Sequence, residues 1–152
     1  MTNPAATASR RMNLFAATLV VLGILGYALA WSESTATGGG GDSENATAAA
    51  PSITPLVFTL GPAAIMAVMG FMSRRIEHSR AVGMIGIHLG MLLPLVFAIA
   101  YAVVGWSRFT KWQAGEKPLA SVLLFLAMVL SSLVATAAII AARPPKADRG
   151  AA

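Results

Sequence analysis

Charged residues are scarce in this chain of 152 residues, and cysteine is absent. Only 11% of the residues are Asp, Glu, Lys or Arg, whereas 57% are hydrophobic, and the mean hydropathy is +0.72. Because soluble domains are roughly 45–50% apolar and about 25% charged, this composition excludes an ordinary soluble domain. The lack of cysteine excludes disulfide bonds and thiol chemistry.

The motifs of soluble enzymes are missing as well. The chain contains no P-loop, no dinucleotide-binding glycine fingerprint and no cluster of residues with metal-ligand spacing. No serine has a histidine and an aspartate beside it, and the long apolar runs contain no carboxylate for acid–base catalysis. We therefore expect no enzymatic activity, no catalytic residues, no cofactor and no metal.

What the chain does contain is four long apolar runs, each free of charged residues. A helix needs about 20 mainly apolar residues to cross a bilayer, and a charge at its centre costs about 2.5–3.5 kcal/mol. A transmembrane barrel would show short alternating segments instead. We predict an all-α integral membrane bundle of four transmembrane helices. These helices are predicted at residues 14–31, 54–72, 82–105 and 119–142.

The basic residues concentrate on one side of the predicted membrane. Eight of the 11 fall there and three on the other side, and with the acidic residues the balances are +6 and −1, giving the net charge of +5. The positive-inside rule then places both termini in the cytoplasm, and we expect the bacterial inner (plasma) membrane. The basic residues do not form the single stripe that nucleic-acid binding needs, so that partner is not expected. The eight are Arg10, Arg11, Arg74, Arg75, Arg80, Arg143, Lys146 and Arg149, and the three are Arg108, Lys111 and Lys117.

The predicted spans divide the chain into a membrane domain at residues 14–142 and cytoplasmic tails at residues 1–13 and 143–152. Residues 32–53, which include four consecutive glycines, are expected to form a flexible external loop. An alternative remains for the first span. Its preceding arginines and its ending at Ala28-Leu29-Ala30 also fit a cleaved signal peptide, although its apolar run is longer than usual.

Small residues recur at helical spacing in three of the spans. Inside lipid there is no hydrophobic drive between helices, so close backbone approach at small residues holds them together. We predict that these positions pack helix against helix within the chain, with a homodimer as the alternative. They are Gly23 and Gly26 in the first span, Ala63, Ala67 and Gly70 in the second, and Gly83, Gly86 and Gly90 in the third.

His88 and Pro94 are the candidates for function inside the third span. His88 lies about 9 Å from the predicted start of that span, and polar groups at such depth usually face the bundle interior or a cavity. It could relay protons, ligate a metal or bind a substrate, but it could equally form an interhelical hydrogen bond. Pro94, like Pro62 in the second span, is expected to kink its helix and thereby help to open a cavity.

Three aromatic residues follow the third span at intervals of three, with Arg108 and Lys111 between them. Tryptophan favours the membrane–water boundary, so we predict an interfacial helical turn, with Gly115 and Pro118 marking the turn into the fourth span. The alternative is a mouth at which Arg108 and Lys111 capture an anionic amphiphile. The aromatic residues are Trp106, Phe109 and Trp112.

The chain resembles the transmembrane protein fourteen family of small four-helix membrane proteins. The matching pieces are Gly23-Ile24-Leu25-Gly26-Tyr27 and Trp106-Ser107-Arg108-Phe109, followed by Lys117-Pro118 before a helix with Leu126 and Met128. The loop at residues 32–52 and the hairpin at residues 74–80 depart from the family pattern. This resemblance implies a role in moving fatty acids or porphyrins across a membrane.

Two hypotheses for function follow. The first is a small carrier or facilitator for apolar or amphipathic molecules, fatty-acid-like or porphyrin-like, with His88 and Pro94 lining its cavity and Arg108 and Lys111 at its outer mouth. The second is a non-catalytic accessory or assembly subunit of a larger membrane complex, suited by the small size and the small-residue faces. The expected partners are the lipid bilayer and, under the second hypothesis, a homo-oligomer or a larger complex.

Overall fold

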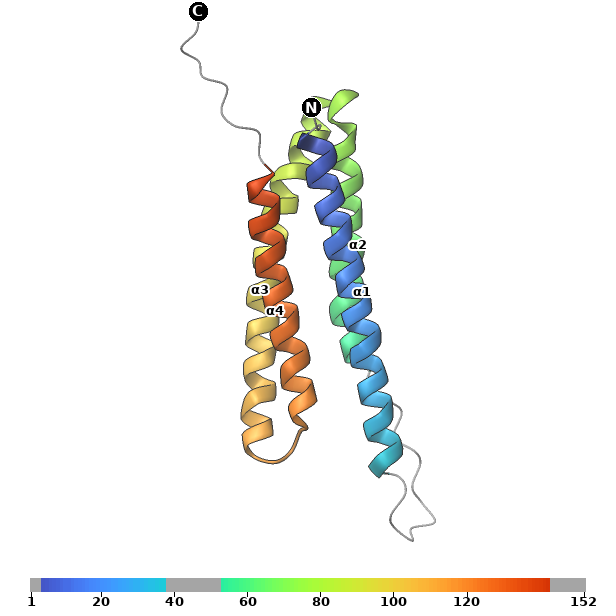
Figure 1. Cartoon of the computed structure of the whole chain (residues 1–152), viewed down its shortest axis with the longest axis vertical. Coiled ribbons are helices and arrows are strands. Elements are labelled where there is room, and N and C mark those ends of the chain that lie inside the picture. Colours follow the sequence, from blue (N-terminus) through green and yellow to red (C-terminus); the bar gives the residue numbers. More distant parts are fainter. Residues whose placement is uncertain (1–3, 38–52, 143–152) are drawn as a thin grey trace, which may run out of the picture.

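The computed structural model describes residues 4–37 and 53–142, and this part of the chain is helical without any strand (Figure 1). Four of its helices are long and apolar enough to cross a membrane. The prediction of an all-α bundle of four membrane-spanning helices is thereby confirmed. The elements are α1 (Pro4–Thr37), α2 (Thr54–Arg74), the short 3-10 helix η1 (Arg75–Glu77), α3 (Arg80–Gln113) and α4 (Leu119–Ala141).

The helices run up and down in sequence order. α1 lies mainly against α2 and α3 against α4, while the contacts of α2 with α3 and of α1 with α4 close the bundle. The start of α1, the end of α4 and the α2–α3 hairpin share one end of the bundle, here called the termini end (Figure 1). The α3–α4 connection lies at the opposite end, here called the turn end.

The first helix starts ten residues earlier than the sequence prediction. α1 begins at Pro4 rather than Leu14, and Met12 is fully buried in the core. The two arginines had excluded this segment from the predicted span, yet Arg11 donates a hydrogen bond to the carbonyl of Ala138 in the last turn of α4. Since the last carbonyls of a helix have no partner within it, the arginine is accommodated at a helix end.

The third helix also exceeds its prediction, because α3 continues through the aromatic segment to Gln113. A glycine then stops it: Gly115 has φ of 75°, and its N–H donates to Trp112 O at 2.9 Å, while Glu116 N–H donates to Lys111 O at 2.9 Å. This pair of bonds is the Schellman motif that ends many helices. Of the predicted external loop, residues 32–37 belong to α1. The rest of that loop up to residue 52, and the C-terminal tail at 143–152, lie outside the described residues.

Seven of the eight predicted packing residues are buried in the bundle. Six are glycines at which an added Cβ would lie within 3 Å of a packed neighbour, so a bulkier residue would require that neighbour to shift. At Gly86, for example, the Cβ would lie 2.7 Å from the backbone nitrogen of Ser73 in α2. The neighbours are Thr59 for Gly23, Pro55 and Leu124 for Gly26, Asn13 for Gly70, Ile76 for Gly83, Ser73 and Met72 for Gly86, and Met12 for Gly90.

The eighth residue, Ala67, is exposed on the outer surface of α2. The buried stripe of this helix passes through Ala63, Met66 and Gly70, which alternates steps of three and four residues as a straight helix requires. Two steps from Ala63 through Ala67 to Gly70 also look helical in sequence. The structure shows that Met66, and not Ala67, occupies the middle of the stripe.

Tyr101 joins α3 to α2 inside the bundle. Its buried hydroxyl donates a hydrogen bond of 2.9 Å to the carbonyl of Phe58. In a regular helix that carbonyl would accept from the N–H of the residue four positions on, but this residue is Pro62, which has no N–H. Tyr101 therefore satisfies the acceptor that the proline leaves open.

The Gly86 contact yields a first prediction. Gly86→Ala should destabilise the protein by about 1–3 kcal/mol, because the new methyl group meets backbone atoms of α2 that cannot rotate away. The matched control is Gly90→Ala on the same face, where the methyl group meets only the adaptable side chain of Met12. Unfolding in mixed micelles measures both variants, and an equal or larger loss for Gly90→Ala would contradict the packing argument.

The Tyr101 contact yields a second prediction. Tyr101→Phe should cost about 1 kcal/mol, because the Phe58 carbonyl then has neither the hydroxyl nor a backbone partner. In a Pro62→Ala background the restored N–H can bond that carbonyl, so the same substitution should cost less. A double-mutant cycle of unfolding free energies measures the difference. Additive effects of the two changes would show that the Tyr101 hydroxyl does not replace the N–H that Pro62 lacks as the partner of the Phe58 carbonyl.

Candidate functional site

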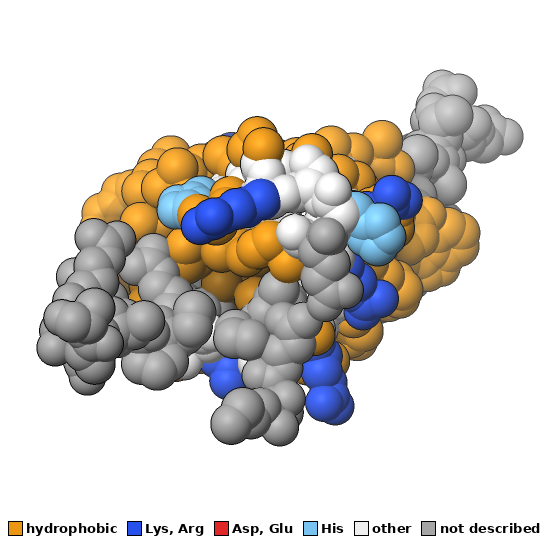
Figure 2. All heavy atoms as spheres, turned by 90° about the horizontal axis from the view of Figure 1, so that it is seen from above, with side chains coloured by type: hydrophobic (Ala, Val, Ile, Leu, Met, Phe, Trp, Pro, Cys, Tyr) orange, Lys and Arg blue, Asp and Glu red, His pale blue; other side chains and the backbone are white. Residues whose placement is uncertain are grey.

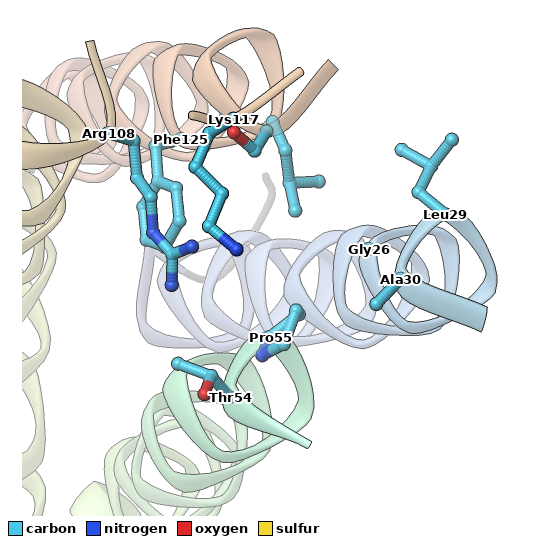
Figure 3. A pocket seen from close by; sticks show the side chains of 10 residues that line it. Gly26, Leu29, Ala30, Thr54, Pro55, Arg108, Lys117 and Phe125 are labelled. Atoms are coloured by element: carbon cyan, nitrogen blue, oxygen red, sulfur yellow. The ribbon is translucent and has the colours of Figure 1, made fainter. Parts of the chain in front are cut away.

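A pocket at the turn end is enclosed by residues from all four helices (Figure 3). Its volume is about 80 Å³, enough for a compact chemical group and below the 300–1,000 Å³ typical of whole-ligand pockets. The walls combine apolar side chains with two cationic ones, and none of the described carboxylates lines it. The lining residues are Gly26, Leu29, Ala30, Thr54, Pro55, Arg108, Lys117, Ser121, Leu124 and Phe125.

The two cations reach the pocket from opposite sides of the α3–α4 connection. Arg108 belongs to the last turns of α3, and Lys117 directly precedes Pro118, whose extended backbone begins α4. The tight turn at Gly115 reverses the chain between them. Figure 3 shows both side chains extending into the space between the α3–α4 pair and the ends of α1 and α2. The turn thus brings two positive charges to one small pocket.

The surroundings of Arg108 restrict the direction of its guanidinium. Its central carbon lies 6.0 Å from the ring centroid of Phe125, a distance at which a cation is attracted to an aromatic face. Phe125 itself is buried and packs edge-on against Phe58. The guanidinium is half-buried on this apolar support, where a fixed fork of donors suits a carboxylate or phosphate group. The chemistry available to the pocket is therefore recognition of an anionic group.

The sequence interpretation paired Arg108 with Lys111, but the structure brings Arg108 together with Lys117. Lys111 is exposed on α3 and does not line the pocket. The spacing of three residues suggested one face, whereas the reversal at Gly115 returns Lys117 to the bundle. A sequence signal existed: a lysine immediately before Pro118 has to lie at the start of the next helix.

The aromatic residues after the third span form a ladder along the end of α3. Ring centroids of Trp106 and Phe109 lie 5.8 Å apart, and those of Phe109 and Trp112 lie 5.6 Å apart. Trp106 is largely exposed, so its ring faces the surroundings of the bundle. This arrangement suits anchoring at a membrane–water boundary. None of the three aromatic residues lines the pocket, whereas Arg108 does.

His88 lies on the outer surface of α3, about 12 Å along the helix from Arg80. Its Nδ1 is 2.7 Å from the carbonyl oxygen of Met84 one turn earlier. It lines neither the turn-end pocket nor two further hollows, one between α1 and α4 and one beside the α2–α3 hairpin. Pro94, in contrast, is fully buried in the bundle, but it also does not line the turn-end pocket.

The termini end carries the other set of cations. Arg10, Arg74, Arg75 and Arg80 are exposed there and Arg11 is half-buried, and Figure 2 shows separate basic side chains and His side chains among hydrophobic ones on this end. Several of these arginines contact other side chains of the bundle. Arg74 Nε donates to the buried Ser9 Oγ at 2.9 Å, and Arg75 stacks over Phe71 with 5.0 Å to its ring centroid.

A shallower hollow beside the α2–α3 hairpin is lined partly by Arg75 and His78. Elsewhere in the described part of the chain, no three His, Asp or Glu side chains gather as a metal site requires. The turn-end pocket is thus the place where side chains from every helix and two cations converge.

Comparison with known proteins assigns no family. No family model matches the chain, and neither a curated protein nor a solved structure matches it. The resemblance to the transmembrane protein fourteen family stays a prediction from the sequence residues quoted above.

Proposed function

We propose that the protein is a small carrier or facilitator for amphipathic molecules that bear an anionic group, and that it catalyses no reaction. The observation that carries this proposal is the convergence of Arg108 and Lys117 on a pocket shared by all four helices. Four helices long and apolar enough to cross a membrane make it an integral membrane protein. The family resemblance adds fatty-acid-like and porphyrin-like compounds as the class of cargo.

The pocket would hold the charged group of such a molecule and leave its apolar part between the helices. A volume of about 80 Å³ suits a carboxylate or phosphate, whereas Leu29, Leu124 and Phe125 supply apolar contact. Passage of the remaining ligand would require the α1–α2 pair to separate from the α3–α4 pair. The pocket lies between these pairs, so ligand entry and separation would occur at the same place.

For orientation, we propose a bacterial inner membrane with both termini in the cytoplasm. Five described arginines lie at the termini end, and the positive-inside rule puts the richer side in the cytoplasm. The turn-end pocket would then open on the external side. An amphiphile arriving from outside would meet Arg108 and Lys117 first.

A second function is favoured by His88. A polar side chain exposed on the outer surface at membrane depth is costly in lipid and commonly meets a polar group of another helix. His88 would then contact a partner, and the protein would be an accessory or assembly subunit of a homo-oligomer or larger membrane complex. The carrier function is preferred because this second function gives the paired cations at the turn end no role.

Orientation gives a third prediction. A reporter active only in the cytoplasm should be active when fused after Ala152, and a reporter active only outside should be active when inserted between Gly39 and Gly40. The physical reason is the excess of basic residues at the termini end. An external C-terminus would contradict the orientation, and a mature protein that begins at Trp31 would show that the first helix is a cleaved signal peptide.

Transport gives a fourth prediction. Liposomes that contain the pure protein should release an entrapped fluorescent porphyrin carboxylate faster than empty liposomes. Arg108→Gln and Lys117→Gln should each lower this protein-dependent rate about tenfold, the effect of losing one charge-assisted hydrogen bond. Lys111→Gln is the matched control, since Lys111 is exposed and lies outside the pocket, and it should leave the rate unchanged.

The outcomes of this assay separate the two functions. Equal losses for Lys111→Gln and Arg108→Gln would indicate general surface charge and contradict the pocket. Absence of flux, together with a constant partner in mild-detergent purifications that His88→Ala releases, would replace the carrier with the accessory subunit.

A further inference from the structure

A long groove runs between α1 and α4 near the termini end, away from the turn-end pocket. Its volume is about 350 Å³, within the range of pockets that hold whole small ligands. The groove opens on the outer surface of the bundle, since Leu14, Leu130 and Val134 on its rim are more than half exposed. Its lining residues are Arg11, Leu14, Phe15, Thr18, Leu130, Ser131, Val134, Ala135 and Ala138.

The body of the groove offers apolar surface. Phe15 and Ala135 are buried and form part of its lining. Its two hydroxyls are occupied within their own helices: Thr18 donates to Leu14 O at 3.0 Å and Ser131 donates to Met128 O at 2.9 Å. A ligand in the groove therefore finds no unsatisfied hydroxyl donor, and a hydrocarbon chain is the occupant that this surface fits.

Arg11 gives the groove one cationic end. Its guanidinium donates to the carbonyl of Ala138, which fixes its position beside the C-terminal end of α4. A guanidinium has five N–H donors, so this bond leaves others for an anion. None of the described carboxylates lines the groove. Residues 11–18 of α1 extend about 10 Å along the helix axis, which is the direction an acyl chain would follow from a headgroup at Arg11.

We propose that this groove binds one acyl chain of an anionic phospholipid, with the lipid phosphate at Arg11. The phospholipid is the occupant because the groove opens sideways toward the bilayer while its cation lies at a helix end, where headgroups are found. The site differs in place and in residues from the turn-end pocket, so it stands or falls separately from the carrier function. The lipid covers the seam at which α1 meets α4.

The experiment is native mass spectrometry of the full chain in mild detergent, with phosphatidylglycerol or phosphatidylcholine added in equal amounts. The wild-type protein should retain one phosphatidylglycerol in preference to phosphatidylcholine. Arg11→Gln should weaken that retention about tenfold, and Ser131→Phe should abolish it by filling the groove. The matched controls are Arg10→Gln and Ala137→Phe, because both residues are exposed outside the groove, and both variants should retain the lipid.

Each other outcome overturns the proposal. Equal weakening by Arg10→Gln and Arg11→Gln would indicate general attraction to a basic surface. Retention by Ser131→Phe would place the chain elsewhere, and this variant keeps the Arg11 bond to α4, so it tests the groove even where Arg11→Gln lowers stability. Equal retention of phosphatidylcholine and phosphatidylglycerol by the wild-type protein would show that the groove does not select an anionic headgroup.

Discussion

Hydrocarbon offers no hydrogen-bond partner, so each backbone group left open inside a span must be satisfied by the chain itself. This constraint explains two of the long-range side-chain bonds that join the helices. Tyr101 serves the Phe58 carbonyl that Pro62 leaves open, and Arg11 serves a carbonyl in the last turn of α4. The first joins α2 to α3 and the second joins α1 to α4. Both bonds thus lie where a carbonyl has no backbone partner within its own helix.

The same surroundings explain the role of glycine. Lipid solvates leucine as well as a neighbouring helix does, so large apolar residues give little preference for packing inward, and many of them are exposed on this bundle. Close contact instead depends on positions such as Gly23 and Gly86, where the adjacent helix occupies the space of a side chain. Ser9 adds a polar contact to this packing, because its hydroxyl donates to the Gly70 carbonyl at 2.8 Å.

The fold could be predicted from the sequence because span length and the exclusion of charge are one-dimensional properties. The helix ends could not be predicted in this way. The exclusion of charged residues from spans removed Arg11 from the first helix, because it takes no account of a distant carbonyl that accepts a hydrogen bond from Arg11. Site geometry was harder still. Ala67 was placed inside by its spacing and His88 by its polarity and depth, but the face that a helix turns inward depends on its neighbours, and both residues are exposed. Lys117 reaches the pocket only because the chain reverses at Gly115. Residue spacing along the sequence does not show which side chains such a reversal brings together.

The distribution of charge suggests different roles for the two ends. At the termini end several arginines are engaged by the protein: Arg74 by Ser9, Arg75 by the ring of Phe71, and Arg11 by α4. Arg11 in addition supplies a donor to a carbonyl at the end of α4. At the turn end Arg108 and Lys117 face a pocket that no described carboxylate lines. Two unneutralised cations near each other repel, and binding an anion between them relieves this repulsion. The turn end, which has fewer of the described cations than the termini end, is thus the one that brings two of them to a single pocket.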